Sequence, residues 1–271
     1  MTETPLLFGS AGEELFGMFH EPPTRASTTG VVLCHPFGEE KLWAHRVFVA
    51  FAREMARRGV PVLRFDYRGN GDSAGDFAAT SVSTAVADTQ RAIALLEDRA
   101  GVSRVVLAGL RFGAIVASQV AELRDDVDAL LLWAPIVDGS KYIQELLRIN
   151  LSTQMAVYRE IRFERPALVE EMRAGRTVNI DGYEMSIGMH DELSAVKLHS
   201  GPKRFAGRCL IVQIDRAPSA RPSPALEALR AQYARATLVT AQEDSFWREI
   251  ERFYDGAPDL FAKTFAWLEG A

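Results

Sequence analysis

Residues 105–114 read Val-Val-Leu-Ala-Gly-Leu-Arg-Phe-Gly-Ala, an apolar run that leads into the pattern Gly109-x-Arg111-x-Gly113. The apolar run predicts a buried β-strand, and the alanines and valines that follow predict a helix. Gly109 and Gly113 are small enough to let the backbone approach closely around a sharp, strained turn between strand and helix. The residue at the centre of such a turn is normally a nucleophile: Ser, Cys or Asp. Here it is Arg111, whose guanidinium stays protonated and carries no usable lone pair.

The composition is that of an ordinary globular domain. The chain has 271 residues, 48% apolar and 25% charged, which is enough to bury a sizeable core. A net charge of -5 gives no electrostatic argument for a nucleic-acid or anionic-membrane partner. No apolar run approaches the length of a membrane span, and residues 1–10 do not resemble a signal peptide. Cys34 and Cys209 lie in strand-like runs and are expected to be buried thiols, so we expect a cytoplasmic protein.

Strands and helices alternate along most of the chain. Strands are predicted at 5–8, 14–20, 31–34, 60–65, 104–108, 127–133, 208–214 and 236–241, and helices at 42–58, 80–99, 112–123, 222–234 and 258–269. This alternation predicts an α/β fold with a mostly parallel, eight-stranded sheet flanked by helices. Between residues 138 and 203 the pattern changes to helical stretches rich in Arg and Glu, with a short hairpin around Asp181-Gly182. We interpret residues 1–137 and 204–271 as the core and residues 138–203 as an inserted helical lid.

Two loops and the turn at Arg111 carry a family resemblance. His35-Pro36-Phe37-Gly38 stands where the α/β-hydrolases of the serine aminopeptidase-like group have an oxyanion loop, and residues 66–73 match that group's Asp-x-Arg-Gly-x-Gly-x-Ser loop. The chain resembles this group over nearly its whole length. Residues 35–40, 109–113 and 182–185 are similar, more narrowly, to the hydrolases encoded with exosortase A (type 2). The resemblance implies a hydrolase of the ester, thioester or amide class in polysaccharide or specialised metabolite biosynthesis.

The catalytic positions that this resemblance implies are degenerate. The triad order in this fold is nucleophile, acid, histidine, and Arg111 holds the first position. Asp215 stands at the acid position, directly after the strand at 208–214. The resemblance places the histidine at 244, where the residue is Asp244, and all five histidines precede residue 200. Two of the three positions are therefore incompatible with Ser-His-Asp acyl transfer.

Arg111 needs partners that the sequence can suggest. A cation at the first turn of a helix is disfavoured by roughly 0.3–1 kcal/mol, and a guanidinium in a pocket needs carboxylates to offset its lost hydration. Three acids, Asp244, Glu39 and Glu40, lie on loops at the same end of the sheet, and we predict that Arg111 pairs with Asp244, Glu39 or both. Arg111 is then either a fixed strut in a dead site or a planar fork that holds an anionic ligand. The third alternative is that the nucleophile turn lies elsewhere in the chain.

The remaining expectations concern the surroundings of this site. His35 either shapes its loop or acts as a general base in a rewired site. The residues expected to contact a substrate are Phe37, Glu39, Glu40, Leu110, Phe112 and Trp247. No spacing suggests a metal site and no glycine-rich phosphate cradle is present, so no cofactor is expected. Two functions stay open: a rewired enzyme that acts on a charged or acyl substrate, and a catalytically dead pseudo-hydrolase that binds a small molecule or a partner protein. A homodimer is compatible with either.

Overall fold

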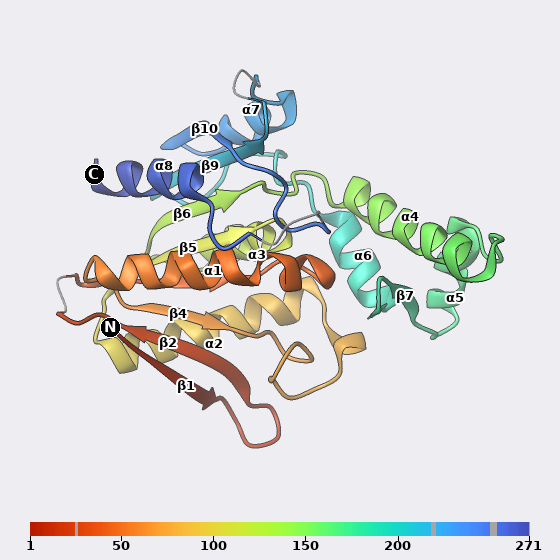
Figure 1. Ribbon diagram of the computed structural model, residues 1–271, viewed down its shortest axis with the longest axis horizontal. Coiled ribbons are helices and arrows are strands. Elements are labelled where there is room, and N and C mark those ends of the chain that lie inside the picture. The colour runs from red at the N-terminus through yellow and green to blue at the C-terminus, as the bar shows by residue number, and fades with distance from the viewer. Residues whose placement is uncertain (25–26, 218–220, 250–253, 271) are drawn as a thin grey trace.

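The computed structural model describes residues 1–24, 27–217, 221–249 and 254–270, and its centre is one eight-stranded sheet (Figure 1). The strands run in the order β1-β2-β4-β3-β5-β6-β9-β10. They are β1 (Thr2–Phe8), β2 (Leu15–Glu21), β3 (Thr29–Cys34), β4 (Val62–Phe65), β5 (Arg104–Leu110), β6 (Val127–Trp133), β9 (Arg208–Asp215) and β10 (Ala236–Gln242). Only the pairings of β2 with β1 and with β4 are antiparallel in this sheet; the other pairings are parallel. The predicted mostly parallel, eight-stranded sheet is confirmed.

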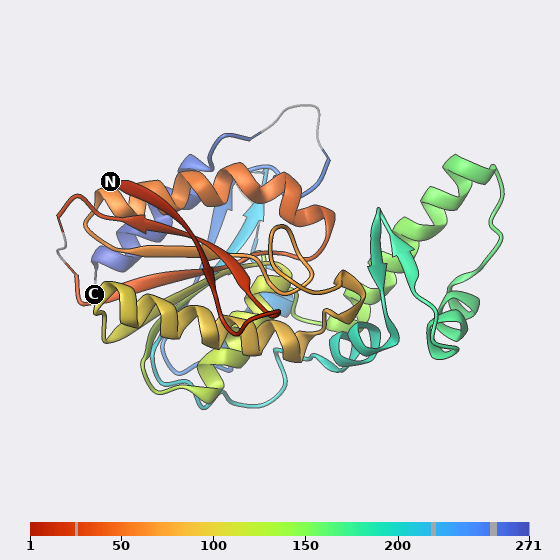
Figure 2. The same cartoon turned by 90° about the horizontal axis from the view of Figure 1, so that it is seen from below.

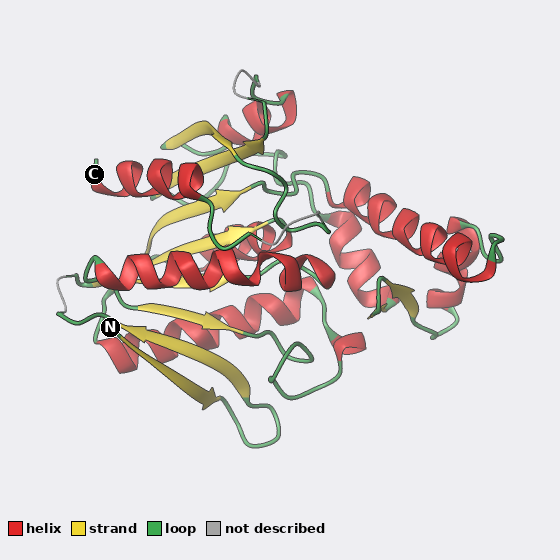
Figure 3. Ribbon diagram, in the orientation of Figure 1, coloured by secondary structure: helices red, strands yellow, loops and turns green. Residues whose placement is uncertain are grey.

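Helices cover both faces of the sheet, as Figures 1 and 3 show. They are α1 (Glu39–Arg57) and α8 (Pro258–Glu269) on one face, and α2 (Val82–Ala100), α3 (Phe112–Leu123) and α7 (Pro224–Arg230) on the other. Each face has its own apolar core, because strands buried on both sides carry apolar residues at successive positions. On the first face Phe51 stacks on Phe265, with ring centroids 5.5 Å apart, and meets Trp133 edge-on at 4.7 Å. Burying one such ring contributes about 1.5–3 kcal/mol.

Two helix boundaries differ from the predicted ones for local reasons. Helix α1 begins at Glu39 rather than at 42, because Gly38 adopts a positive φ of 54° that lets the chain turn directly into the helix. Its first turn holds Glu39 and Glu40, which the helix dipole favours. Helix α7 is shorter than predicted: Ser223 caps it and Pro224 occupies its first turn, and it ends at Arg230.

Residues 138–203 form a separate group of elements between β6 and β9, which are neighbours in the sheet. The group contains α4 (Gly139–Tyr158), α5 (Arg165–Arg173), the hairpin β7 (Val178–Ile180) and β8 (Tyr183–Met185), and α6 (Ile187–Ala195). Figure 2 shows it extending beyond the ends of the central strands, on the side where β5 leads into α3. The predicted hairpin turn is present, with positive φ at Asp181 and Gly182.

Two further expectations concern the two cysteines and membrane-spanning helices. Cys34 and Cys209 are fully buried thiols, as predicted, and burial raises the pKa of both. Within the described ranges, no helix combines the length and the apolar character that crossing a lipid bilayer requires.

Candidate functional site

The turn between β5 and α3 has the strained geometry that the two glycines predict. Arg111 adopts φ 54° and ψ −114°, an unusual conformation for a residue with a side chain, and its N–H donates to the carbonyl of Trp133 at 3.0 Å. A Cβ on Gly109 would lie 2.2 Å from the carbonyl oxygen of Gly113, and a Cβ on Gly113 would lie 1.9 Å from that of Cys34. Only glycine fits at either position, and the turn presents Arg111 at its apex.

The guanidinium of Arg111 contacts two carboxylates and two aromatic rings. Its Nε donates to Oε1 of Glu40 at 3.1 Å, and its Nη2 donates to Oε2 of Glu145 at 3.4 Å. The guanidinium carbon lies 5.0 Å from the centroid of the Tyr142 ring and 5.6 Å from that of Trp247, within cation–π range. We call these five side chains the Arg111 cluster.

The predicted partners of Arg111, Asp244 and Glu39, are wrong. Because α1 begins at Glu39, Glu40 is one position further along the helix and is turned toward Arg111. Glu39 faces Tyr183 instead, whose pKa is raised by burial and by this carboxylate. Asp244 is engaged elsewhere: its Oδ1 lies 2.6 Å from Nε of Arg216, and it accepts a hydrogen bond from the hydroxyl of Tyr254.

Glu40 is the anionic centre of the cluster. Only 16% of its side chain is exposed, against 14% for Arg111, and its Oε2 accepts a hydrogen bond from the hydroxyl of Tyr142 at 3.0 Å. Burial raises the pKa of Glu40, and Arg111 and Tyr142 oppose that rise. Burial also works to lower the pKa of Arg111, but Glu40, Tyr142 and Glu145 together outweigh it and leave that pKa raised. The two groups therefore depend on each other for charge compensation.

Two cavities meet at the Arg111 cluster. The larger, about 780 Å³, lies between the start of α1, helix α4 and residues 247–249; we call it the Arg111 cavity. The smaller, about 600 Å³, lies toward Asp215 and His199. The side chains common to both linings are Arg111, Tyr142, Glu145 and Trp247. The cluster is therefore a shared wall at the position where a nucleophile would stand.

The other predicted site residues fall into separate places. Phe37, Glu39, Glu40 and Trp247 line the Arg111 cavity, and Asp215 lines the smaller one. Leu110 and Phe112 have exposed fractions of 0% and 1%, so their side chains pack in the two cores and do not reach a ligand, contrary to the expected role. The backbone of Phe112 differs from its side chain: because Phe112 is the first residue of α3, its N–H has no acceptor within the helix.

His35 does not face the Arg111 cavity. Its Nδ1 lies 2.8 Å from the carbonyl oxygen of Pro36, and its Nε2 accepts a hydrogen bond from the N–H of Tyr67 at 3.3 Å. Burial, with the nearby Lys41, lowers the pKa of His35 to about 3. Both ring nitrogens are occupied by the backbone, so the geometry fits the loop-shaping alternative and leaves no nitrogen for general-base chemistry.

Tyr142 and Glu145 are the site residues that sequence reasoning missed. Both lie on α4 of the insertion, three positions apart and so on one face of the helix. That spacing was visible, but nothing local in the sequence indicates that this face of α4 meets the β5–α3 turn. In the described part of the chain, no group of three or more His, Cys, Asp and Glu side chains is placed to hold a metal ion.

The strand order and the strained β5–α3 turn define an α/β-hydrolase fold. Residues 26–191, more than half of the chain, match the family described as serine aminopeptidase, S33, and the chain belongs to this family.

Solved structures and one curated protein are similar to it. Est1E from Butyrivibrio proteoclasticus, solved with ferulic acid, superposes with a TM-score of 0.65 at 19% identity over 87% of this chain and 88% of that chain. A hydrolase from Agrobacterium vitis described as putative superposes with a TM-score of 0.61 at 17% identity over 99% and 98%. Esterase EstD from Thermotoga maritima is 26% identical over 145 residues, which are 49% of this chain and 35% of that protein. The chain thus spans about a third of the length of this curated relative.

Proposed function

We propose that this chain is a non-hydrolytic member of its family, a pseudo-hydrolase that binds a small anionic molecule in the Arg111 cavity. The observation that carries the proposal is the state of Arg111: a cation stands at the nucleophile position, and Glu40 and Glu145 engage it. A guanidinium cannot attack a carbonyl, and this one is fixed in place. We take the site to be built for binding rather than for acyl transfer.

The residue at the histidine position supports the same conclusion. Asp244 is tied to Arg216 and Tyr254 and offers no imidazole to activate a serine or a water. Asp215 keeps the acid position, yet its Oδ1 accepts the N–H of Ala217 at 2.9 Å, which is a turn contact. The nucleophile position, Arg111, and the histidine position, Asp244, lie on different loops, so we propose that catalytic residues have been replaced at two separate places.

The ligand class follows from the lining of the cavity. Within the described ranges Nη1 of Arg111 makes no hydrogen bond, which leaves a donor for a ligand carboxylate. Arg148 and Arg248 add positive charge to a lining that also holds Glu39, Asp181 and Glu249 beside the two acids paired with Arg111. We therefore place the ligand carboxylate at Arg111 and its body against Trp43 and Trp247, which offer flat apolar surface. A cavity of about 780 Å³ suits a drug-sized organic acid. Residues 138–203 supply Tyr142 and Glu145 and would act as the lid over this ligand.

A fluorophosphonate probe tests the loss of hydrolase chemistry. We expect the intact mass of the protein to be unchanged after incubation, because Arg111 and not a serine stands at the apex of the β5–α3 turn. A stoichiometric adduct that maps to a single serine would refute the proposal and make the chain a hydrolase. The variant Arg111→Ser/Asp244→His, described in the Discussion, is the matched comparison.

Ferulate tests the binding function, since Est1E was solved with ferulic acid. We expect calorimetric binding that Arg111→Gln weakens about tenfold, the typical effect of losing a charge-assisted contact. Arg173→Gln, at an exposed position paired only with Glu170, is the control and should leave the affinity unchanged. Equal binding by both variants would contradict the role given to Arg111.

A rewired enzyme is the second candidate, and one observation favours it. Glu40 is a buried carboxyl whose pKa burial raises, at the wall of a cavity, and such groups are frequent general acids. Turnover of p-nitrophenyl esters or acyl thioesters that disappears in Glu40→Gln and persists in Glu39→Gln would favour this candidate. The pathway we propose for either candidate, polysaccharide or specialised metabolite biosynthesis, rests on the resemblance of residues 35–40, 109–113 and 182–185 alone. A cytoplasmic location and a homodimer stay predictions.

A further inference from the structure

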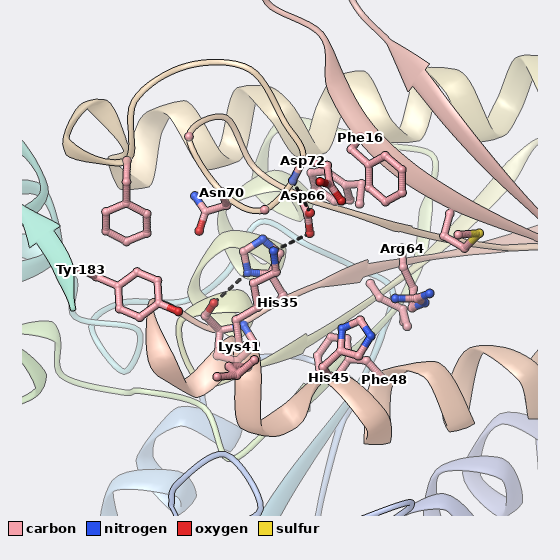
Figure 4. A pocket seen from close by; sticks show the side chains of 18 residues that line it. Phe16, His35, Lys41, His45, Phe48, Arg64, Asp66, Asn70, Asp72 and Tyr183 are labelled. Atoms are coloured by element: carbon pink, nitrogen blue, oxygen red, sulfur yellow. Dashed lines mark hydrogen bonds and ion pairs between the residues drawn. The ribbon is translucent and has the colours of Figure 1, made fainter. Parts of the chain in front are cut away.

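A third cavity, of about 490 Å³, lies between α1, the strands β2 and β4, and the glycine-rich loop at residues 69–72 (Figure 4); we call it the Arg64 cavity. None of the described residues that line it also lines the Arg111 cavity. We propose that this Arg64 cavity is a separate binding site for a small organic carboxylate with an apolar body, held through the guanidinium of Arg64.

Within the described ranges no carboxylate contacts the guanidinium of Arg64 directly, and Glu3 and Asp66 offset its charge only in part, from a distance. Arg64 is half-buried on β4, and within the described ranges it makes no ion pair; its one hydrogen bond runs from Nε to Nε2 of His20 at 3.0 Å. The two nearest acids are already engaged: Glu3 binds Arg53 at 2.6 Å, and Asp66 binds Lys41 at 2.6 Å. Burial lowers the pKa of Arg64, the sign of an incompletely compensated cation. An anionic ligand would supply the missing charge.

His45 gives the same side of the cavity a neutral hydrogen-bonding group. Figure 4 shows His45 and Arg64 lying together beside α1 and β4, away from Asp66 and Asp72 at the glycine-rich loop. Burial and the charge of Arg64 lower the pKa of His45, so its imidazole is neutral near pH 7 and retains one N–H donor. The Lys41–Asp66 pair neutralises itself, so the cavity is polarised with its positive end at Arg64.

The remainder of the lining is mostly apolar and suits the body of the ligand. The apolar side chains that line the cavity are Phe16, Met18, Leu33, Leu42, Phe48, Phe65 and Phe77. A volume of about 490 Å³ lies within the usual range of small-molecule sites. Both an aromatic acid and a short fatty acid have the required chemistry, a single carboxylate on a compact apolar body, and the experiment separates them.

Calorimetric titration with 3-phenylpropionate and with octanoate tests the proposal on the full-length protein. We expect at least one probe to bind, and we expect Arg64→Gln to raise its Kd about tenfold or more. Arg57→Gln removes the same charge from an exposed position on α1 and should leave the Kd within about twofold. Probe-specific binding identifies whether an aromatic or an acyl body is preferred.

A measurement on the unmodified protein guards against a variant that fails to fold. Met18 lines the Arg64 cavity, and its ¹³C-methyl resonance, assigned with Met18→Leu, should shift on titration of the binding probe, while those of the insertion methionines Met172, Met185 and Met189 do not. Absence of binding at millimolar concentrations of both probes would overturn the proposal. So would affinity that depends on Arg111 but not on Arg64, or a Met18 signal that stays in place. These outcomes leave the function proposed for the Arg111 cavity to its own tests.

Discussion

Replacing Glu40 with Gln should destabilise the protein far more than its position in the chain suggests. The change keeps the size of the side chain and an acceptor for the hydroxyl of Tyr142, but it removes the charge that compensates Arg111. Arg111 would keep only Glu145, whose carboxylate is 49% exposed and 3.4 Å away. An exposed partner at that distance offsets little of the lost hydration of a nearly buried guanidinium.

The magnitude can be estimated from the burial of the pair. Breaking a buried ion pair by removing one partner costs about 3–5 kcal/mol. The amide retained at position 40 and the residual contact with Glu145 place the expected loss at the lower end, about 3 kcal/mol. For a chain of this size that corresponds to a fall in Tm of about 6 °C, at roughly 2 °C per kcal/mol.

The neighbouring residue provides a matched control. Glu39→Gln makes the same chemical change one position earlier, in the same first turn of α1, so the loss of interaction with the helix dipole is common to both variants. Within the described ranges Glu39 makes no ion pair, and its variant should lie within about 0.5 kcal/mol of the unmodified protein. Urea unfolding followed by far-ultraviolet circular dichroism measures both. Equal stability of the two variants would refute the compensation that we assign to the Glu40–Arg111 pair.

Three further predictions follow from other parts of the structure. Arg111→Ser alone should not hydrolyse p-nitrophenyl acetate, because no base stands at position 244; adding Asp244→His should permit turnover, and activity of the single variant would contradict that assignment. Gly113→Ala should unfold the protein or cost more than about 3 kcal/mol, because its Cβ would enter a backbone carbonyl. Gly188→Ala, on a helix where a Cβ would lie 3.8 Å from Oγ of Ser186, should change stability by less than about 1 kcal/mol; melting curves measure both variants. Asp138→Asn should cost about 1 kcal/mol at neutral pH while retaining the cap of α4. Lys197 lowers the pKa of Asp138, so the stability that the carboxylate contributes is complete above about pH 4 and is lost progressively as the pH falls below it; the difference in stability between the variant and the unmodified protein should therefore shrink on acidification.

The fold was largely predictable because its signals are local. The buried strands of a parallel sheet are continuous apolar runs, and the helices between them repeat every three to four residues. The errors lie where one residue changed the local geometry. Gly38 starts α1 early through its positive φ, and Ser223 with Pro224 fixes the start of α7. The hairpin at Asp181-Gly182 was found because its turn needs residues that tolerate positive φ.

The site was predictable only in part, because its partners come from distant segments. The chain pattern locates Arg111 at the turn and shows that a carboxylate must neutralise it. It does not show that the start of α1 rotates Glu40, rather than Glu39, toward the guanidinium, since a shift of one residue on a helix turns a side chain by about 100°. Nor does it show that α4 of the insertion contributes Tyr142 and Glu145, because the docking of that helix depends on tertiary contacts.

The backbone at Arg111 shows how the β5–α3 turn can carry an arginine at its apex and keep its geometry. A non-glycine residue at φ 54° costs on the order of 1–3 kcal/mol, and in an active hydrolase that strain exposes the nucleophile. Here it persists with an arginine at the apex, because Gly109 and Gly113 allow contacts between β5, α3 and β3 that fix the backbone whatever side chain the apex carries. The apex residue is therefore free to change its chemistry, provided that its new charge is compensated. Glu40 supplies that compensation from the first turn of α1, and the same pair that fills the catalytic position also joins α1 to the β5–α3 turn.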